Sequence, residues 1–583
     1  MFLITATKAK IKGKLNLPKT KEIQVSPFTI TIVTDNFLSD YEVNAEGFLL
    51  TETPDISKKN TNKIIFSKIA YEKQPLAFTL KQLTTSGRPI YYHINEKGEF
   101  FCSTHISLLK KAGVKIEENK KALPEFFIYR YVIPPRTIYK GIYKILNGGE
   151  VKIKLVNNKW TVDSVKLTES FYKKNERSSG TKAHIVNFAN NLLNDSLKGI
   201  SYPPENIGLL MSGGLDSSLL CKLFQKNYNI KNTYSGGYPF ESAETNTEKT
   251  YAISASRALG TDHTYYEPTS EEYLRGVIEA INAAEEPLNH LQTVVISQLI
   301  KQGIPPKKKL IISGLGADGL FGNELQNKIF RGNKRLWKMM SKQPLLAMLE
   351  KASALTSKGK GFVKFLKEKE RLTCSFQNPK HIIWSSERYG SEEWVMKYFG
   401  ATEEDIISGR YETIKQFENE SIYDVLFILN VLGSSPVTQS IWSKIAESNG
   451  KAVYYPFDYE PLIDFVRELD WKIKLKKPKN ILLLVAKKIN LPAFIINRKK
   501  SGFGLNKPGW AEKGGAFEPL VSLASKAFDE TEIRKMQSLE QKKAMTYWNI
   551  LNYAIWKRLF INGEPLNKLL EELNNVMANK KIK

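Results

Sequence analysis

The stretch Ile207-Gly-Leu-Leu-Met-Ser-Gly-Gly-Leu-Asp-Ser-Ser218 decides the fold of this 583-residue chain. An apolar strand, Ile207–Met211, runs into a glycine turn, and a helix is expected to begin near Asp216. Glycines let backbone N–H groups approach an anion closely, and the start of a helix adds free donors and a positive dipole end. Asp216 would repel a phosphate unless a cation bridged them, which suggests Mg²⁺. Further hydroxyl donors come from Ser212, Ser217 and Ser218. The stretch therefore predicts a phosphate-binding loop.

A second loop of the same construction follows about 100 residues later, at Leu310-Ile-Ile-Ser-Gly-Leu-Gly-Ala-Asp-Gly-Leu-Phe-Gly322. It again places one carboxylate, Asp318, after an apolar strand and a glycine turn. In open α/β sheets ligands bind at the carboxyl ends of the strands. We therefore expect Asp216 and Asp318 to lie on adjacent loops and to share magnesium bound to a nucleotide.

The surrounding segments alternate between short apolar strands and helices. Ile230–Ser235 and Leu310–Ser313 read as strands, and the segments expected to be helical are His184–Leu197, Thr247–Leu259 and Ser270–Ala283. This alternation predicts a parallel sheet covered on both faces. Residues 326–380 are lysine-rich and predict a helical insertion, and the last third of the chain reads as helical.

Residues 1 to about 155 have a different composition, which is rich in β-branched and aromatic residues. Phe28–Val33, Pro89–His93 and Val151–Val156 predict strands between turn signals. The polar stretch Asn157–Thr181 predicts a linker. We therefore expect one domain over residues 1–170 and a second, larger one over residues 184–570.

The formal net charge is +26, from 86 Lys and Arg against 60 Asp and Glu. Such an excess of positive charge would suit binding to a polyanion, which is an alternative reading of the protein. The lysines are scattered, however, and no nucleic-acid-binding motif accompanies them. No apolar run reaches the length of about 20 residues that a membrane span needs. The N-terminus lacks the apolar core of a secretory signal. The three cysteines fit neither a disulfide framework nor a zinc site, so we expect a cytoplasmic protein.

The first loop resembles the pyrophosphate loop of the N-type ATP pyrophosphatases, which cleave ATP between the α and β phosphates. Together the two loops resemble those of asparagine synthetases and their relatives, the β-lactam synthetases and the lasso peptide cyclases. Further matching segments are Arg88-Pro-Ile-Tyr-Tyr92, Glu285-Glu-Pro287 and Arg498-Lys-Lys-Ser-Gly-Phe-Gly504. The resemblance covers roughly residues 75–560. It implies an Ntn-hydrolase-like α+β domain, followed by a doubly wound parallel-sheet ATP pyrophosphatase domain (adenine nucleotide α-hydrolase-like) with a helical C-terminal part.

The resemblance also implies roles for individual residues. Lys500 would stabilise charge as an acyl-adenylate forms or breaks, and Asp216 and Asp318 would bind Mg²⁺. The residues implied to bind ATP are Leu210, Met211, Ser212, Gly213, Gly214, Asp216, Ser217, Ser218, Gly236, Ser313 and Gly314.

Two departures from the family pattern bear on the chemistry. Glutamine-dependent members use an N-terminal cysteine as nucleophile, whereas Met1 here is followed by Phe2, so glutaminase activity is expected to be lost. In the second loop Leu315 and Gly319 replace residues that are usually acidic or tyrosine, so a general base must come from elsewhere. The candidates are Glu285, which we favour, and Glu286, Tyr454 and Tyr455.

The sequence thus predicts an ATP-dependent ligase that adenylates a small-molecule or peptide carboxylate, with ATP and Mg²⁺ as cofactors, for attack by an amine. The amine is expected not to come from glutamine and could belong to the substrate itself. Three alternatives stay open: an ammonia-dependent asparagine synthetase, a tRNA-modifying ATP pyrophosphatase, and a nucleotide-binding pseudoenzyme. The sequence does not define an oligomeric state.

Overall fold

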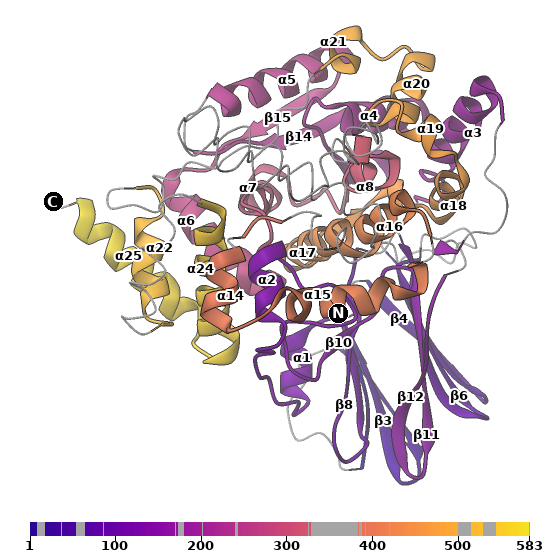
Figure 1. Ribbon diagram of the computed structural model, residues 1–583, viewed down its shortest axis with the longest axis vertical. Helices are drawn as coiled ribbons and strands as arrows, with labels where there is room; N and C mark the ends of the chain where they lie inside the picture. Colours follow the sequence, from indigo (N-terminus) through magenta and orange to yellow (C-terminus); the bar gives the residue numbers. More distant parts are fainter. Residues whose placement is uncertain are drawn as a thin grey trace, which may run out of the picture.

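The computed structural model describes most of the chain (Figure 1). The described residues are 1–8, 18–35, 38–53, 65–84, 87–168, 171–172, 180–200, 202–239, 243–323, 326–327, 383, 388–390, 392–418, 420–498, 515–528 and 544–581. Nearly all of the predicted insertion at 326–380 and the predicted catalytic residue Lys500 lie outside them.

The N-terminal part is built from two six-stranded antiparallel sheets, which extend to the lower edge of Figure 1. One has the order β10-β8-β9-β1-β3-β2 and the other β12-β11-β7-β6-β5-β4. The strands are β1 (Phe2–Thr7), β2 (Lys19–Val25), β3 (Phe28–Thr34), β4 (Ser39–Asn44), β5 (Gly47–Glu52), β6 (Ser67–Lys73), β7 (Leu76–Gln82), β8 (Tyr91–Ile94), β9 (Phe100–Ser103), β10 (Tyr143–Lys144), β11 (Gly149–Val156) and β12 (Lys159–Leu167).

Strand β1 lies in the middle of the first sheet, and its side chains are buried on both faces. Because successive side chains of a strand point to opposite faces, Phe2 and Ile4 enter the core shared with the second sheet, while Leu3 joins the core that continues into the rest of the protein. Phe2 is fully buried. The second residue of the chain is therefore a packing residue of the sandwich.

The predicted linker at Asn157–Thr181 is wrong over its first half. Lys159–Leu167 forms β12, which pairs antiparallel with β11 through a register running from Gly149↔Leu167 to Val156↔Lys159. The turn uses Asn157 and Asn158, both with positive φ, which is a conformation that asparagine tolerates well. Polar residues dominate β12 because it is an edge strand with most side chains exposed.

The larger C-terminal part contains a five-stranded sheet of order β15-β14-β13-β16-β17, in which every pair is parallel. Its strands are β13 (Ile207–Leu210), β14 (Asn232–Gly236), β15 (Asp262–Tyr266), β16 (Leu310–Ile312) and β17 (Ala452–Tyr454). In Figure 1, α5 lies above β14 and β15, and α7 and α17 lie below them. The predicted fold class, an Ntn-hydrolase-like part followed by a parallel-sheet pyrophosphate-loop part, is confirmed.

Most of the remaining described residues are helical. The helices are α1 (Ile106–Lys111), α2 (Leu123–Tyr129), α3 (Lys182–Asp195), α4 (Leu215–Tyr228), α5 (Ala243–Leu259), α6 (Ser270–Ala284), α7 (Gln292–Gln298), α8 (Ala317–Phe321), α14 (Glu392–Phe399), α15 (Glu403–Ile414), α16 (Ile422–Leu429), α17 (Ser435–Ser448), α18 (Glu460–Glu468), α19 (Trp471–Lys474), α20 (Asn480–Lys488), α21 (Ala493–Ile496), α22 (Glu518–Ser525), α24 (Ala544–Trp556) and α25 (Leu566–Lys581).

One continuous helical stretch, Tyr423–Ser448, is long and apolar enough to cross a membrane by length and composition, and no other in the described part of the chain is. It is 89% buried inside the protein. It carries polar side chains such as Lys444 and Glu447 into buried ion pairs, as described below. Its apolar character is that of a core helix of a large protein.

Buried ion pairs join the two parts of the chain. Lys444 of α17 pairs with Glu285 at 2.7 Å, and Lys144 of the N-terminal part pairs with Glu286 at 2.8 Å. Arg88 lies between Glu52 and Glu447, at 2.9 and 2.8 Å. Breaking a buried pair from one side is costly because the remaining charge stays buried. These contacts fix the N-terminal part against α17 and the residues that follow α6.

Candidate functional site

The first glycine-rich loop connects β13 to α4 at the carboxyl end of the central strand. The hydroxyls of Ser212 and Ser217 lie 3.2 Å apart, and the Ser212 N–H donates to Ser217 Oγ at 3.2 Å. The Gly214 N–H donates to Ser212 Oγ at 3.3 Å. The loop thus closes on itself around the start of α4, where the first N–H groups of a helix lack partners within the helix itself.

Gly213 is required by geometry. Its φ is +69°, and a Cβ atom at this position would lie 2.3 Å from the Tyr251 carbonyl oxygen of α5. Any side chain would push the loop away from α5. The glycine turn is therefore held closely against a neighbouring helix, and only glycine allows this approach.

The second loop, between β16 and α8, lies directly beside the first. Strands β13 and β16 are parallel neighbours with Leu209 opposite Ile312, so both loops leave the same edge of the sheet. A Cβ atom on Gly314 would lie 3.3 Å from the Ser217 N–H nitrogen. Ser313 is held by a hydrogen bond from its N–H to the Tyr454 carbonyl at 3.0 Å. The expected juxtaposition of the two loops is present.

Asp216 and Asp318 are brought together, and a lysine that the sequence reasoning did not single out lies between them. Lys479 Nζ contacts Asp318 Oδ1 at 2.8 Å and also forms an ion pair with Asp216 Oδ2. Burial disfavours the charged ammonium, but the two carboxylates more than compensate, so the pKa of Lys479 rises above its usual range. The two aspartates therefore share one ammonium group at the edge of the sheet.

Lys479 was missed because it ends the basic run Lys472–Lys479, which reads as a solvated surface. The structure places it at the start of α20 in the left-handed conformation, with φ +53°, and its side chain is only 12% exposed. The sequence offered only a weak signal, its position immediately before the helix that begins at Asn480, where a lysine is slightly unfavourable for the helix dipole.

The other residues that the resemblance implies for ATP binding lie along the same edge. Met211 is buried, and its N–H donates to the Tyr234 carbonyl at 2.8 Å. On β14, Ser235 Oγ lies 2.8 Å from His263 Nε2, just before Gly236. Burial lowers the pKa of His263 to about 4, so this histidine is neutral at physiological pH. Leu210 at the end of β13, and Ser313 and Gly314 just after β16, complete this region.

Glu285, which the sequence reasoning favoured as a catalytic base, instead joins the two parts of the chain. Its carboxylate accepts hydrogen bonds from the N–H groups of Ile106 and Ser107 at 2.8 and 3.0 Å, and pairs with Lys444. Burial would raise its pKa, but Lys444 and His105 lower it to about 2. A carboxylate so firmly ionised and fully engaged is a poor proton acceptor near neutral pH. We do not retain Glu285 as a base.

The other candidates for a base are also engaged in the fold. Glu286 accepts from Tyr91 Oη at 2.7 Å and pairs with Lys144. Tyr454 Oη donates to the Ser196 carbonyl at 2.7 Å and Tyr455 Oη to the Gln439 carbonyl at 3.0 Å. Burial raises the pKa of both tyrosines far above neutrality.

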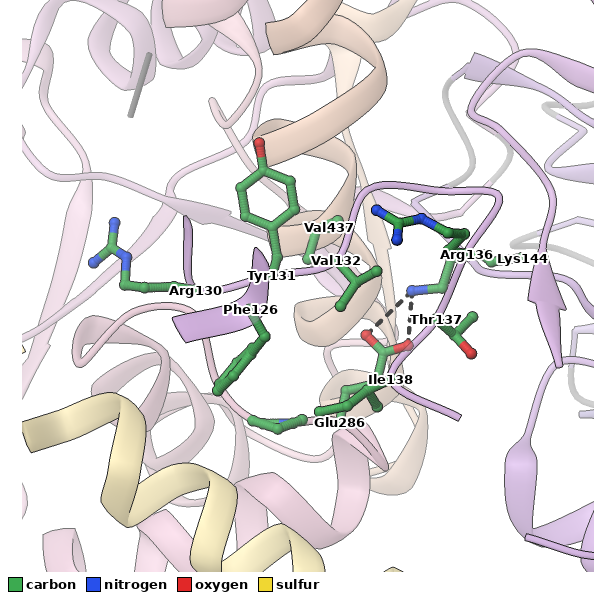
Figure 2. Close-up of a pocket in the computed structure, with 11 residues that line it drawn as sticks. Phe126, Arg130, Tyr131, Val132, Arg136, Thr137, Ile138, Lys144, Glu286 and Val437 are labelled. Carbon is green, nitrogen blue, oxygen red and sulfur yellow. Dashed lines mark hydrogen bonds and ion pairs between the residues drawn. The ribbon is translucent and has the colours of Figure 1, made fainter. Parts of the chain in front are cut away.

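A small cavity of about 20 Å³ lies away from the two loops, between α2 and the segment that follows α6 (Figure 2). It has room for about one water molecule. Figure 2 shows the Lys144 ammonium facing both oxygens of Glu286 at its edge. It is lined by Phe126, Arg130, Tyr131, Val132, Arg136, Thr137, Ile138, Lys144, Glu286, Pro287 and Val437. No residue of either glycine loop lines it, and it is too small for a nucleotide.

One further carboxyl group lies against the second loop. Asp458, which follows β17, is buried, and a Cβ atom on Gly316 would lie 2.7 Å from its Oδ1 atom. Its other oxygen accepts a hydrogen bond from Gln439 Nε2. Burial raises the pKa of Asp458 to about 8, and the Gln439 bond offsets only part of this rise.

Asp458→Asn is expected to reduce the pH dependence of stability. The folded pKa lies above the unfolded value of about 4, so the contribution of Asp458 is fully present below pH 4 and is lost as the pH rises toward 8. An amide cannot ionise, so the variant should gain roughly 3–4 kcal/mol relative to the native chain between pH 5 and pH 8. Urea unfolding at pH 5 and pH 8 measures this. If the free energy of unfolding changed equally between these pH values in the native chain and in the variant, the prediction would be contradicted.

Comparison with known proteins agrees with this geometry. The asparagine synthase family model matches residues 190–558, and a glutamine amidotransferase domain model matches residues 62–163. The chain is 23% identical over 499 residues to asparagine synthetase [glutamine-hydrolyzing] 1 of Bacillus subtilis, covering 81% of this chain and 74% of that protein. It is 22% identical over 217 residues to a putative asparagine synthetase [glutamine-hydrolyzing] of Mycobacterium tuberculosis, covering 37% of this chain and 32% of that protein. With more than half of its length matched by the first model, the chain belongs to the asparagine synthase family of ATP-dependent, amide-forming ligases.

Proposed function

We propose that this protein adenylates a carboxylate with ATP, releases pyrophosphate, and joins the activated acyl group to an amine from a source other than glutamine. The observation that carries the proposal is the convergence of two glycine loops, Asp216, Asp318 and Lys479 at one edge of the parallel sheet. Donors and a cation gathered where phosphates would lie can stabilise a leaving pyrophosphate.

The reaction consists of two displacements. A carboxylate oxygen of the substrate attacks the α-phosphorus of ATP, and the bond from that phosphorus to the α–β bridging oxygen breaks, so pyrophosphate leaves. The amine nitrogen then attacks the acyl carbon, loses a proton, and AMP leaves with the carboxylate oxygen that attacked the phosphorus. In this scheme the N–H groups and hydroxyls around Ser212–Ser218 hold the pyrophosphate, and the Lys479 ammonium offsets its negative charge.

Asp216 and Asp318 would hold Mg²⁺, which supplies charge neutralisation for the phosphates. Their carboxylate oxygens are the ligands that this ion prefers, and their joint contact with the Lys479 ammonium indicates a site suited to positive charge. Within the described residues no group of three or more His, Cys, Asp or Glu side chains could hold a metal. Two protein carboxylates with phosphate and water ligands suit Mg²⁺, which keeps several waters.

The proposal that glutamine is not the nitrogen source rests on the N-terminal sandwich. Phe2 lies in the inter-sheet core of this sandwich. Cys102, which belongs to this core, is fully buried in β9, and burial raises its pKa well above the usual value. A neutral, enclosed thiol is a weak nucleophile. The amine is then free ammonia or an amine of the substrate itself.

Nitrogen-source dependence tests this assignment. Purified protein with MgATP and a small-molecule extract would be assayed for pyrophosphate without added nitrogen, with ammonium, and with glutamine. We expect turnover that is unchanged by glutamine, and either stimulated by ammonium or independent of both. Conversion of glutamine to glutamate in step with pyrophosphate release would overturn the glutamine-independent part of the proposal.

A further inference from the structure

The pyrophosphate loop is held from outside by an arginine from a distant part of the chain. Arg498 Nη1 donates to the Ser212 carbonyl at 3.0 Å. Its other terminal nitrogen pairs with Glu248 of α5, and its guanidinium lies over the Tyr251 ring at 4.2 Å from the centroid. The side chain is only 6% exposed. An arginine in three such contacts is fixed in orientation, as its planar fork favours.

This contact bears directly on how the loop presents its donors. A peptide unit is planar, so its carbonyl and the following N–H point in opposite directions. Holding the Ser212 carbonyl toward Arg498 therefore turns the Gly213 N–H away from the guanidinium, to the opposite side of the loop. A carbonyl swung inward would instead present a negative dipole to a phosphate.

Helix α5 supplies the other contacts of Arg498. Glu248 and Tyr251, one turn apart, hold the guanidinium, and the Tyr251 carbonyl lies against Gly213. Arg498 Nη1 is also 3.9 Å from the position of a Cβ atom on Gly214. The arginine thus binds the entry of the glycine turn and lies near its middle, and its Nε has no hydrogen-bond partner among the described residues.

We propose that Arg498 is a positioning residue that sets the affinity of the loop for pyrophosphate by fixing the Ser212–Gly213 peptide, with Glu248 orienting its guanidinium. This inference rests on the proposed function, because it takes the loop to bind the pyrophosphate part of ATP. It adds a residue outside both glycine loops to the determinants of nucleotide binding.

Calorimetric titration with magnesium pyrophosphate and with MgATP tests the role of Arg498. Arg498→Gln should weaken pyrophosphate binding about tenfold or more, and Arg498→Lys should recover part of the loss because an ammonium can still reach the carbonyl. Glu248→Gln should weaken binding less than Arg498→Gln. Arg558→Gln is the matched control, since Arg558 is a buried arginine paired with Glu564 and Glu572.

The Arg558→Gln control distinguishes an effect on the position of the loop from a general loss of protein stability. Arg558→Gln should lower the melting temperature with unchanged pyrophosphate affinity. Equal affinities for the native chain and Arg498→Gln, or equal losses in Arg498→Gln and Arg558→Gln, would overturn the inference. Because binding is measured without turnover, a native chain that binds pyrophosphate but releases none from ATP would count against the proposed function alone. A native chain that binds neither ligand would overturn both.

Discussion

Replacing either aspartate of the cation site, in Asp216→Asn or Asp318→Asn, is expected to lower pyrophosphate release at least about a hundredfold. Each change removes a full negative charge from a pair that already holds an ammonium between them. The amide keeps the size of the side chain, so packing of α4 and α8 should be preserved. Initial rates at saturating MgATP measure the effect, and a magnesium titration should show a higher half-saturating concentration for both variants.

Asp163→Asn provides the control for the aspartate variants. Asp163 pairs with Lys154 at 3.0 Å on the partly exposed edge of the N-terminal sandwich. It should keep the native rate, as surface pairs contribute little. If Asp216→Asn or Asp318→Asn retained more than about a third of the native rate with an intact fold, the cation site would not be part of the chemistry.

Lys479→Met is expected to have a comparably large effect, a loss of about 10²-fold or more in kcat. The substitution keeps the apolar stem but removes the ammonium that contacts both aspartates. Without it, the two carboxylates lose the positive charge that they share, so the melting temperature should rise with added Mg²⁺ more steeply than in the native chain. Steady-state kinetics and thermal unfolding with and without Mg²⁺ give both numbers.

Lys472→Met, at the other end of the same basic run, is the matched control for the lysine. Lys472 belongs to the short helix α19, and its ammonium does not take part in the contact with Asp216 and Asp318. Native kinetics in Lys472→Met combined with a strong defect in Lys479→Met is the expected pattern. Similar rates for the two variants would show that the ammonium between the aspartates is only structural.

The sequence predicted those elements whose signals are local. Ile207–Met211 and Leu310–Ser313 are short apolar runs that end in glycine turns, and the structure has β13 and β16 at these places. The predicted helix Ser270–Ala283 agrees closely with α6, whose Thr269 and Glu272 form a capping box. Periodicity, caps and turns act within a few residues, so one sequence is enough to read them.

The features that sequence reasoning missed depend on contacts between distant segments. Lys479 reaches Asp216 from 263 residues away, and nothing in the local basic run distinguishes it clearly from its neighbours. Glu285 stands in a matching motif, but its role follows from Lys444 and from the start of α1. Strand β12 has a polar sequence that resembles a linker, and only its pairing with β11 makes it a strand.

The central claim is that ATP is cleaved between its α and β phosphates, and label tracing tests it most directly. The native protein would be incubated with ATP labelled in the α-phosphate, Mg²⁺ and the carboxylate-containing extract, and the labelled products separated. We predict labelled AMP in equal amount to released pyrophosphate, with both lowered at least about a hundredfold in Asp216→Asn. Labelled ADP with release of inorganic phosphate would contradict it.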